Sequence, residues 1–455
     1  MELCTADVDA HRLARAQIMT FLSTEIRRLR TSSLAHNAGW MLVGQGLNLV
    51  LQAGYFILLA RLLGVTEYGI FVGAFAFVSL ATPYSALGSG VLFIQYVSTN
   101  AENFAAYWGN ILLATLGAGG LMTALLCLTA PHLLNPASAS VVLLVALGEC
   151  ICRQIVFCIW QVFQAFEQLR MMAILILLAG SIRVSAVVCM ALVLHHATAW
   201  QWAFWSMIVS ILSAIVASAI VLVRFGRPRF VPRLFFTRLG EGFNFSFAGS
   251  TQSVYNDIDK TMLSHYGMNL ANGIYTMAYR IVDVATIPVT ALDAAALPRY
   301  FRQSAQGAAS VVGLSVRLAW RAALIGILMS GCMFVAAPLI PHIVGQGFSE
   351  SVSALRWLCL IPAFRGVHQL TGSAITGMGF QRYRTMAQFS AAVLNFVLNL
   401  LLIPRYGWLG AAWVSLATDG ALGVTNSLIL GYISGRSFRN SGNVWNGGAE
   451  TDDQA

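Results

Sequence analysis

The side chains with the most distinctive chemistry in this sequence are charged groups set inside apolar stretches. The only lysine of the chain, Lys260, closes the run Asn256-Asp257-Ile258-Asp259-Lys260. At helical spacing Gln252, Asn256, Asp259 and Lys260 share one broad stripe. A charge inside a membrane span costs several kcal/mol unless it faces a wet cavity or a partner. We therefore expect Lys260 to bind cargo or take part in coupling, with a simple pairing to Asp257 as the alternative.

The next apolar stretch repeats this design, because Arg280 and Asp283 lie one helical turn apart. Glu149 and Arg153 have a similar spacing in an earlier stretch. Either pair has two interpretations: an ion pair that only holds helices together, or part of a functional site. His368, three residues after Arg365, is interpreted as a structural histidine.

Motifs for catalysis or metal binding do not appear in the sequence. The histidines are scattered, and Cys150 and Cys152 would point about 200° apart on a helix, which is wrong for joint ligation. Phosphate loops, nucleophile elbows and paired carboxylates on a soluble domain are not found. We expect no catalytic residue, no metal and no cofactor, so the chain is not expected to be an enzyme.

The elements that must position these charges are membrane helices. With 58% hydrophobic and 10% charged residues, the chain lacks the polar surface of a soluble protein. Stretches of about 20 apolar residues are long enough to cross the hydrocarbon core. The expected fold is all-α and integral to the membrane, with about 12 transmembrane helices in two parallel six-helix repeats around a central cavity. These stretches are 37–59, 70–93, 107–129, 139–163, 171–194, 201–223, 243–264, 272–296, 317–338, 353–376, 385–403 and 409–433.

Short patterns recur about half the chain apart and indicate the duplication. Gly69-Ile70-Phe71 returns as Gly273-Ile274-Tyr275, and Trp200 with Trp205 returns as Trp408 with Trp413. Their shared order indicates that a whole block is repeated. The expected parts are a basic cytoplasmic tail at 1–36, a first repeat at 37–223, an Arg-rich cytoplasmic linker at 224–238, a second repeat at 239–434 and a disordered cytoplasmic tail at 435–455.

The formal net charge of +9 comes from arginines in alternate loops. Loops rich in arginine face the cytoplasm by the positive-inside rule, so both termini are expected there. The basic charge is thus explained by topology, and we expect no nucleic-acid partner.

The loop Leu63-Gly64-Val65-Thr66-Glu67-Tyr68-Gly69, and the stretch from Asn256 through Gly273-Ile274-Tyr275 to Pro298-Arg299-Tyr300, resemble the polysaccharide-export branch of the multidrug/oligosaccharidyl-lipid/polysaccharide (MOP) transporter superfamily. The resemblance implies a flippase for undecaprenyl-diphosphate-linked oligosaccharides in the bacterial inner membrane, working by alternating access on an H⁺ or Na⁺ gradient. Implied partners are the lipid-linked oligosaccharide and the polysaccharide polymerase and assembly machinery. Implied cargo-binding residues are Lys260, Arg280, Arg153, Arg183, Arg365, Asn256 and Gln252, and implied ion-coupling residues are Asp259, Asp257, Asp283 and Glu149.

Two transport functions stay open at this point. One is the flippase, and the alternative is an ion-coupled exporter of small amphipathic cations from the same superfamily. Several basic residues inside the spans favour an anionic cargo, and short loops disfavour a glycan polymerase. Of the two carboxylates beside Lys260, we expect Asp259 to matter more for coupling than Asp257, because Asp259 lies nearer to Asn256 in helical projection.

Overall fold

The computed structural model of this protein describes residues 33–194, 196–304 and 306–446. Side chains at 33–39, 42, 248, 252 and 435–446 are also outside the description, as is most of the two expected tails. Within the described residues the chain is helical and contains no strand. The all-α fold expected from the sequence is therefore confirmed.

The first lobe consists of the helices up to residue 225. Its first helix, α2, is broken at Gly64, whose φ of 72° lies in the left-handed region that glycine adopts without steric cost. A π-helix, η3, interrupts the fourth crossing. The elements are α2 (Ser33–Ala81), η1 (Thr82–Tyr84), α3 (Ser89–Val97), η2 (Ala101–Asn103), α4 (Phe104–Leu133), α5 (Pro136–Ala139), α6 (Val142–Ala146), η3 (Leu147–Arg153), α7 (Gln154–Ala165), α8 (Leu169–Val193) and α9 (Ala199–Phe225).

The second lobe follows the linker that ends at residue 231. Its last helix, α17, continues to Asn446, into the stretch that the sequence assigns to a disordered tail. The elements are α10 (Pro232–His265), α11 (Asn269–Ser304), α12 (Ala308–Ala336), η4 (Ala337–Leu339), α13 (Ile340–Val344), η5 (Gln346–Phe348), α14 (Ser351–Leu358), α15 (Ile361–Gly377), α16 (Gln381–Tyr406) and α17 (Trp408–Asn446).

Eight helical segments of the described chain are long and apolar enough to cross a membrane. One of them, Val43–Val97, holds two crossings because the chain turns at Gly64. The other crossings are α10, α14 with α15, and α17, which are less apolar because they carry charges such as Asp259, Arg365 and Asp419. Together these agree with the expected two repeats of six crossings in a multi-pass membrane protein.

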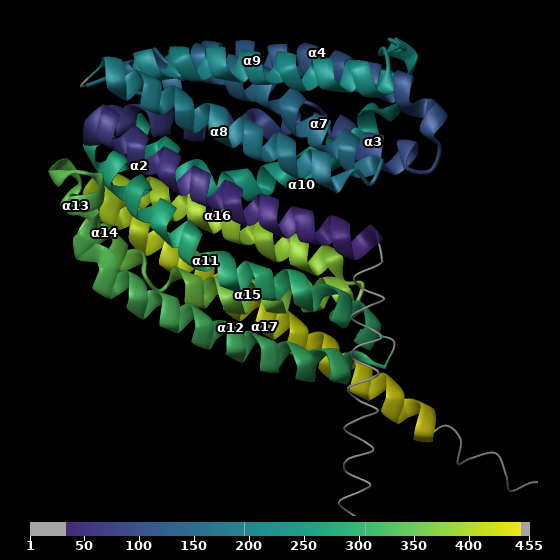
Figure 1. Cartoon of the computed structure of the whole chain (residues 1–455). Helices are drawn as coiled ribbons and strands as arrows, with labels where there is room; N and C mark the ends of the chain where they lie inside the picture. Colours follow the sequence, from purple (N-terminus) through teal and green to yellow (C-terminus); the bar gives the residue numbers. More distant parts are fainter. Residues whose placement is uncertain (1–32, 195, 305, 447–455) are drawn as a thin grey trace, which may run out of the picture.

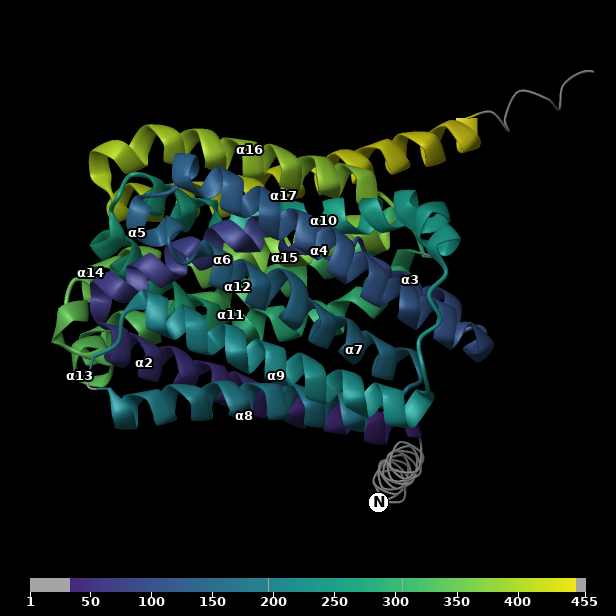
Figure 2. The same ribbon diagram turned by 90° about the horizontal axis from the view of Figure 1, so that it is seen from above.

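The two lobes lie side by side, with α2 and α10 between them (Figure 1). Connections between helices gather at two opposite ends of the bundle (Figures 1 and 2). We call the end that carries the turn at Gly64 the Gly64 end, and the end that carries the 226–231 linker the linker end. The linker is fixed to the first lobe, because Arg229 N donates to Ala105 O at 2.7 Å.

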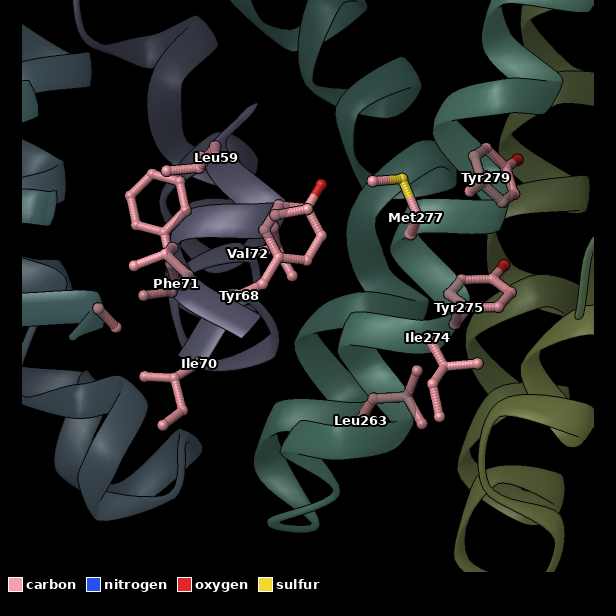
Figure 3. Close-up of a cluster of buried hydrophobic side chains, with 14 of the residues drawn as sticks. Leu59, Tyr68, Ile70, Phe71, Val72, Leu263, Ile274, Tyr275, Met277 and Tyr279 are labelled. Carbon is pink, nitrogen blue, oxygen red and sulfur yellow. The ribbon is translucent and has the colours of Figure 1, made fainter. Parts of the chain in front are cut away.

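The lobes close tightly on each other at the Gly64 end. Tyr68 of α2 lies on the side toward Met277 of α11, whereas Phe71 points away and packs on Trp202 of its own lobe, with ring centres 6.4 Å apart (Figure 3). The two copies of the repeated Gly-Ile-aromatic pattern meet here. A Cβ on Gly69 would lie 1.8 Å from Asn269 O, so only glycine permits this approach.

Hydrogen bonds complete the seal at the Gly64 end. Asn135 Nδ2, from the first lobe, donates to Ser264 O at 2.6 Å and to Asn269 Oδ1 at 2.9 Å. In the opposite sense, Asn272 Nδ2 of the second lobe donates to Gly69 O at 3.2 Å. Any space between the lobes therefore has to open elsewhere.

Candidate functional site

The charged centre of the first lobe is a carboxylate held by two guanidinium groups. Arg183 Nη2 of α8 lies 2.9 Å from Glu149 Oε1, and Arg153 Nη1 lies 3.2 Å from Glu149 Oε2. Glu149 and Arg153 both come from η3, and π-helical turns are frequent at functional sites. Glu149 is buried, whereas the Arg153 side chain is 43% exposed. The group keeps a net positive charge with one arginine directed to open space.

That open space is a cavity of about 520 Å³ between the lobes, a size typical of ligand sites. Its walls come from both lobes, and it reaches from the charged centre toward the linker end. Glu149, Arg153 and Arg183 are the charged residues among the described side chains that line it. The uncharged lining includes Asn48, Gln52, Gln154, Phe157, Trp160, Gln161, Phe245, Ser246, Gly249 and Ser253.

A third arginine, from the other lobe, faces the same region. A smaller cavity of about 160 Å³ shares Arg153 and Arg183 with the larger one and adds Arg280 of α11. The Arg280 guanidinium carbon lies 4.4 Å from the ring centre of Phe56, and Asp283 Oδ2 is 3.6 Å from its Nη1. The structure thus brings together Arg153, Arg183 and Arg280 from among the residues expected to hold cargo.

Lys260 is fully paired within its own helix. Its Nζ is 2.9 Å from Asp257 Oδ1 and 3.7 Å from Asp259 Oδ1, and it donates to Asn256 O. It also sits 4.7 Å from the ring centre of Tyr279. Lys260 is 4% exposed and lines neither of the two cavities described above.

A second network joins three helices, α11, α15 and α17, inside the second lobe. Arg365 of α15 donates to Tyr279 OH at 2.6 Å and to Asp283 Oδ1 at 3.2 Å. Its Nε is 3.6 Å from Asp419 Oδ2 of α17, and His368 Nε2 is 3.3 Å from Asp419 Oδ1. Arg365 therefore holds helices together in this state and lines neither cavity.

Two other residues that the sequence predicts to bind cargo are Asn256 and Gln252. Asn256 contributes its carbonyl to Lys260, and the side chain of Gln252 lies outside the described residues. Sequence reasoning missed Tyr255, which donates to Asp419, and Ser79, which donates to Asp257. Tyr255 precedes Asp259 by four residues and so had a helical-spacing signal. Among the described residues no group of His, Cys, Asp and Glu is arranged to hold a metal ion.

Solved structures share this two-lobed fold. An inward-facing multidrug resistance MATE family transporter of the MOP superfamily matches with a TM-score of 0.71 at 10% identity, over 87% of this chain and 96% of that chain. The lipid II flippase MurJ, in an inward closed conformation, matches with a TM-score of 0.66 at 14% identity, over 86% of each chain. The chain thus shares the two-lobed fold of these MOP-type transporters.

Sequence similarity assigns the chain to one family. Residues 34–304 match the family described as "Polysaccharide biosynthesis protein", and the chain belongs to that family. An uncharacterized membrane protein of Methanocaldococcus jannaschii is 24% identical over 176 residues, which cover 38% of this chain and 41% of that relative. The match spans less than half the length of that relative. The expected membership in the polysaccharide-export branch of the MOP superfamily is confirmed.

Proposed function

We propose that this protein is a flippase that moves an undecaprenyl-diphosphate-linked oligosaccharide across the bacterial inner membrane for surface polysaccharide synthesis. The cargo would enter the cavity between the lobes while the Gly64 end is closed, and would leave after the lobes close at the linker end and part at the Gly64 end. This is alternating access around a fixed site. The polymerase and assembly machinery would then receive the glycan.

The observation that carries the proposal is the convergence of Arg153, Arg183 and Arg280 on one region with one buried carboxylate, Glu149. Guanidinium groups bind phosphate through paired hydrogen bonds, and these are strong where water is scarce. A diphosphate placed there would meet arginines from both lobes. The charge of the diphosphate would therefore interact with both lobes, which must move relative to each other during transport.

The alternative, export of amphipathic cations, requires an acidic group free to pair with the drug. Glu149 is the acidic residue of the larger cavity, and two arginines already occupy its oxygens. Asp283 is likewise engaged by Arg280 and Arg365. This charge balance favours an anionic cargo.

We further propose that H⁺ or Na⁺ drives the cycle through carboxylates that lie within the membrane helices. Asp257 and Asp259 flank Lys260, and Asp283 bridges Arg280 and Arg365. A cation arriving at one of these groups would release its basic partner. An ion drives transport only when the two access states bind it with different affinity, and a carboxylate paired in one state and free in the other meets this condition.

The test is complementation of a deletion strain with charge-removing variants. Arg153→Gln and Arg183→Gln should leave the protein inserted but cut surface glycan at least tenfold, since each lost charge-assisted bond costs about 1.5–3 kcal/mol. Lipid-linked glycan should accumulate on the cytoplasmic face. Arg317→Gln is the matched control, because Arg317 is exposed and bonds only to Gly313 O of its own helix. Normal glycan in all three strains, with raised sensitivity to amphipathic cations, would instead favour the exporter.

A further inference from the structure

The helix that follows Arg153 presents a distinct set of side chains to the cavity. Phe157, Trp160 and Gln161 lie at spacings of four, seven and eight residues from Arg153, so they share its face of α7. All of them line the larger cavity. Phe157 is 46% exposed, and its ring centre is 6.0 Å from that of Trp160 in an edge-to-face arrangement.

The opposing wall leaves room in front of this aromatic pair. It is built from α10, where Phe245 and Ser246 are followed by Gly249, whereas Gly90 of α3 lies beside α7. The Gly90 contact is close, since a Cβ there would lie 1.7 Å from Gln161 Oε1. Glycine at this position lets the amide of Gln161 stay against the cavity wall.

This part of the cavity differs chemically from the arginine region. Its described lining combines aromatic, amide and hydroxyl groups with aliphatic side chains such as Val91 and Val156, and it contains no charged side chain beyond Glu149, Arg153 and Arg183. The indole N–H of Trp160 is itself buried and has no acceptor among the described residues, so the face of the ring, rather than this donor, is available to a ligand. Aromatic faces combined with amide and hydroxyl groups match a ring that carries both C–H faces and hydroxyl groups, which is a sugar.

The spacing between the two regions fits a glycosyl diphosphate. Seven residues separate Arg153 from Trp160 on a continuous helix, which corresponds to about 10 Å at 1.5 Å per residue. A diphosphate held at Arg153 and Arg183 would place the first sugars of its glycan beside Phe157 and Trp160. The rest of the glycan would extend toward the linker end.

We infer that Phe157, Trp160 and Gln161 form a glycan subsite, in which the sugar next to the diphosphate packs on the aromatic pair and hydrogen-bonds to the amide. The inference rests on the proposed function, because it assumes that the arginines hold the diphosphate. It assigns Trp160 as a residue that distinguishes a glycosylated carrier lipid from the bare one.

The test compares two ligands on purified full-length protein. One is a short-chain prenyl diphosphate that carries a neutral disaccharide, and the other is the same prenyl diphosphate without sugar. The wild type should bind the glycosylated ligand more tightly. Trp160→Ala should lose about tenfold of that preference, which corresponds to about 1.4 kcal/mol, while binding of the bare ligand stays constant. Trp160→Phe should keep most of the preference because an aromatic face remains.

Two comparisons separate the subsite from the proposed function. Trp200→Ala is the matched control, since Trp200 is 51% exposed at the Gly64 end and stacks on Phe204. Arg153→Gln should weaken both ligands together. If Trp160→Ala weakened the binding of both ligands equally, or weakened the binding of neither, the glycan subsite would be overturned. The diphosphate site would remain intact. Failure of the wild type to bind either ligand would instead overturn the proposed function, and the subsite with it.

Discussion

The hydroxyl of Ser79 donates a hydrogen bond of 2.7 Å to Asp257 Oδ2 and thereby joins the first lobe to the second. The other oxygen of this carboxylate, Oδ1, lies 2.9 Å from Lys260 Nζ. Asp257 is thus bonded at once to α2 and to the lysine of its own helix.

We predict that Ser79→Ala favours opening of the Gly64 end. The change removes one hydrogen bond to a charged group, which should weaken the closed state by about 1.5–3 kcal/mol. Hydrogen–deuterium exchange over 65–75 and 264–276 should rise accordingly. Ser427→Ala serves as control, because Ser427 bonds only to Gly423 O of its own helix. Equal exchange in the two variants would show that the Ser79 contact does not hold the lobes.

The sequence predicted the helices and their duplication because both depend on local patterns of apolar residues. It showed that Gly69 and Gly273 correspond, but the meeting of the two copies at the Gly64 end depends on how the repeats dock. The arginines were found because charges are conspicuous in apolar spans. Their division into a cavity-lining set and a paired set that includes Lys260 and Arg365 could not be predicted, since it depends on which helix faces each side chain.

The contacts of uncharged polar residues were harder to predict from the sequence. Ser79 lies in an apolar helix and its hydroxyl is also 2.7 Å from Ala76 O of its own backbone, as is usual for a helical serine, so its contact with Asp257 had no sequence signal. The π-helix from Leu147 to Arg153 also had none, because its extra residue per turn is decided by packing. The sequence interpretation of His368 as structural did not consider Asp419 as its neighbour, which the crossing of α15 and α17 provides.

We predict that Asp257→Asn lowers thermal stability more than the double variant Asp257→Asn/Lys260→Met. Removing one member of a buried ion pair leaves the other charge uncompensated and typically costs about 3–5 kcal/mol, whereas replacing both is often neutral. The single variant leaves Lys260 with only the more distant Asp259, at 3.7 Å. Thermal unfolding in detergent is the measurement. A double variant that is no more stable than the single one would show that Lys260 finds another partner.

Asp259 allows a separate test of coupling. It is 2% exposed and accepts hydrogen bonds from Tyr275 OH at 2.5 Å and from Lys260 N at 2.7 Å, all within the second lobe. Asp259→Asn keeps the size of the side chain but removes its charge, so transport in reconstituted vesicles should no longer respond to collapse of the ion gradient. Asp257→Asn, assayed at a temperature where it stays folded, should respond more like the wild type. A full response of Asp259→Asn would move the coupling site to Asp283 or Glu149.

Glu149 is expected to limit how tightly the cavity holds its cargo. Glu149→Gln frees Arg153 and Arg183 from their carboxylate, so a prenyl diphosphate should bind about tenfold more tightly, an effect of about 1.4 kcal/mol. Export should slow because release becomes harder. Titration with the diphosphate and the export rate are measured together. Glu241→Gln, which removes a carboxylate paired with Arg238 at the linker end, should change neither. Weaker binding in Glu149→Gln would mean that Glu149 only positions the arginines.

The final prediction concerns which end of the bundle faces the cytoplasm. Residues 168 and 229 lie in connections at the linker end, where residue 381 begins α16, and residues 197 and 349 lie in connections at the Gly64 end. Arginines concentrate at the linker end, so the positive-inside rule predicts that it faces the cytoplasm. Reporters fused at Gln168, Arg229 and Gln381 should therefore read cytoplasmic, and those at Ala197 and Ser349 should read external.

This orientation decides the direction of transport. If the linker end is cytoplasmic, the closed Gly64 end is external, and the cavity beside Arg153 and Trp160 is open to the face on which lipid-linked glycans would be loaded. A reversed pattern, with the Arg229 fusion external, would contradict both the topology and loading from the cytoplasm. It would leave the arginine cluster as an anion site whose cargo enters from outside.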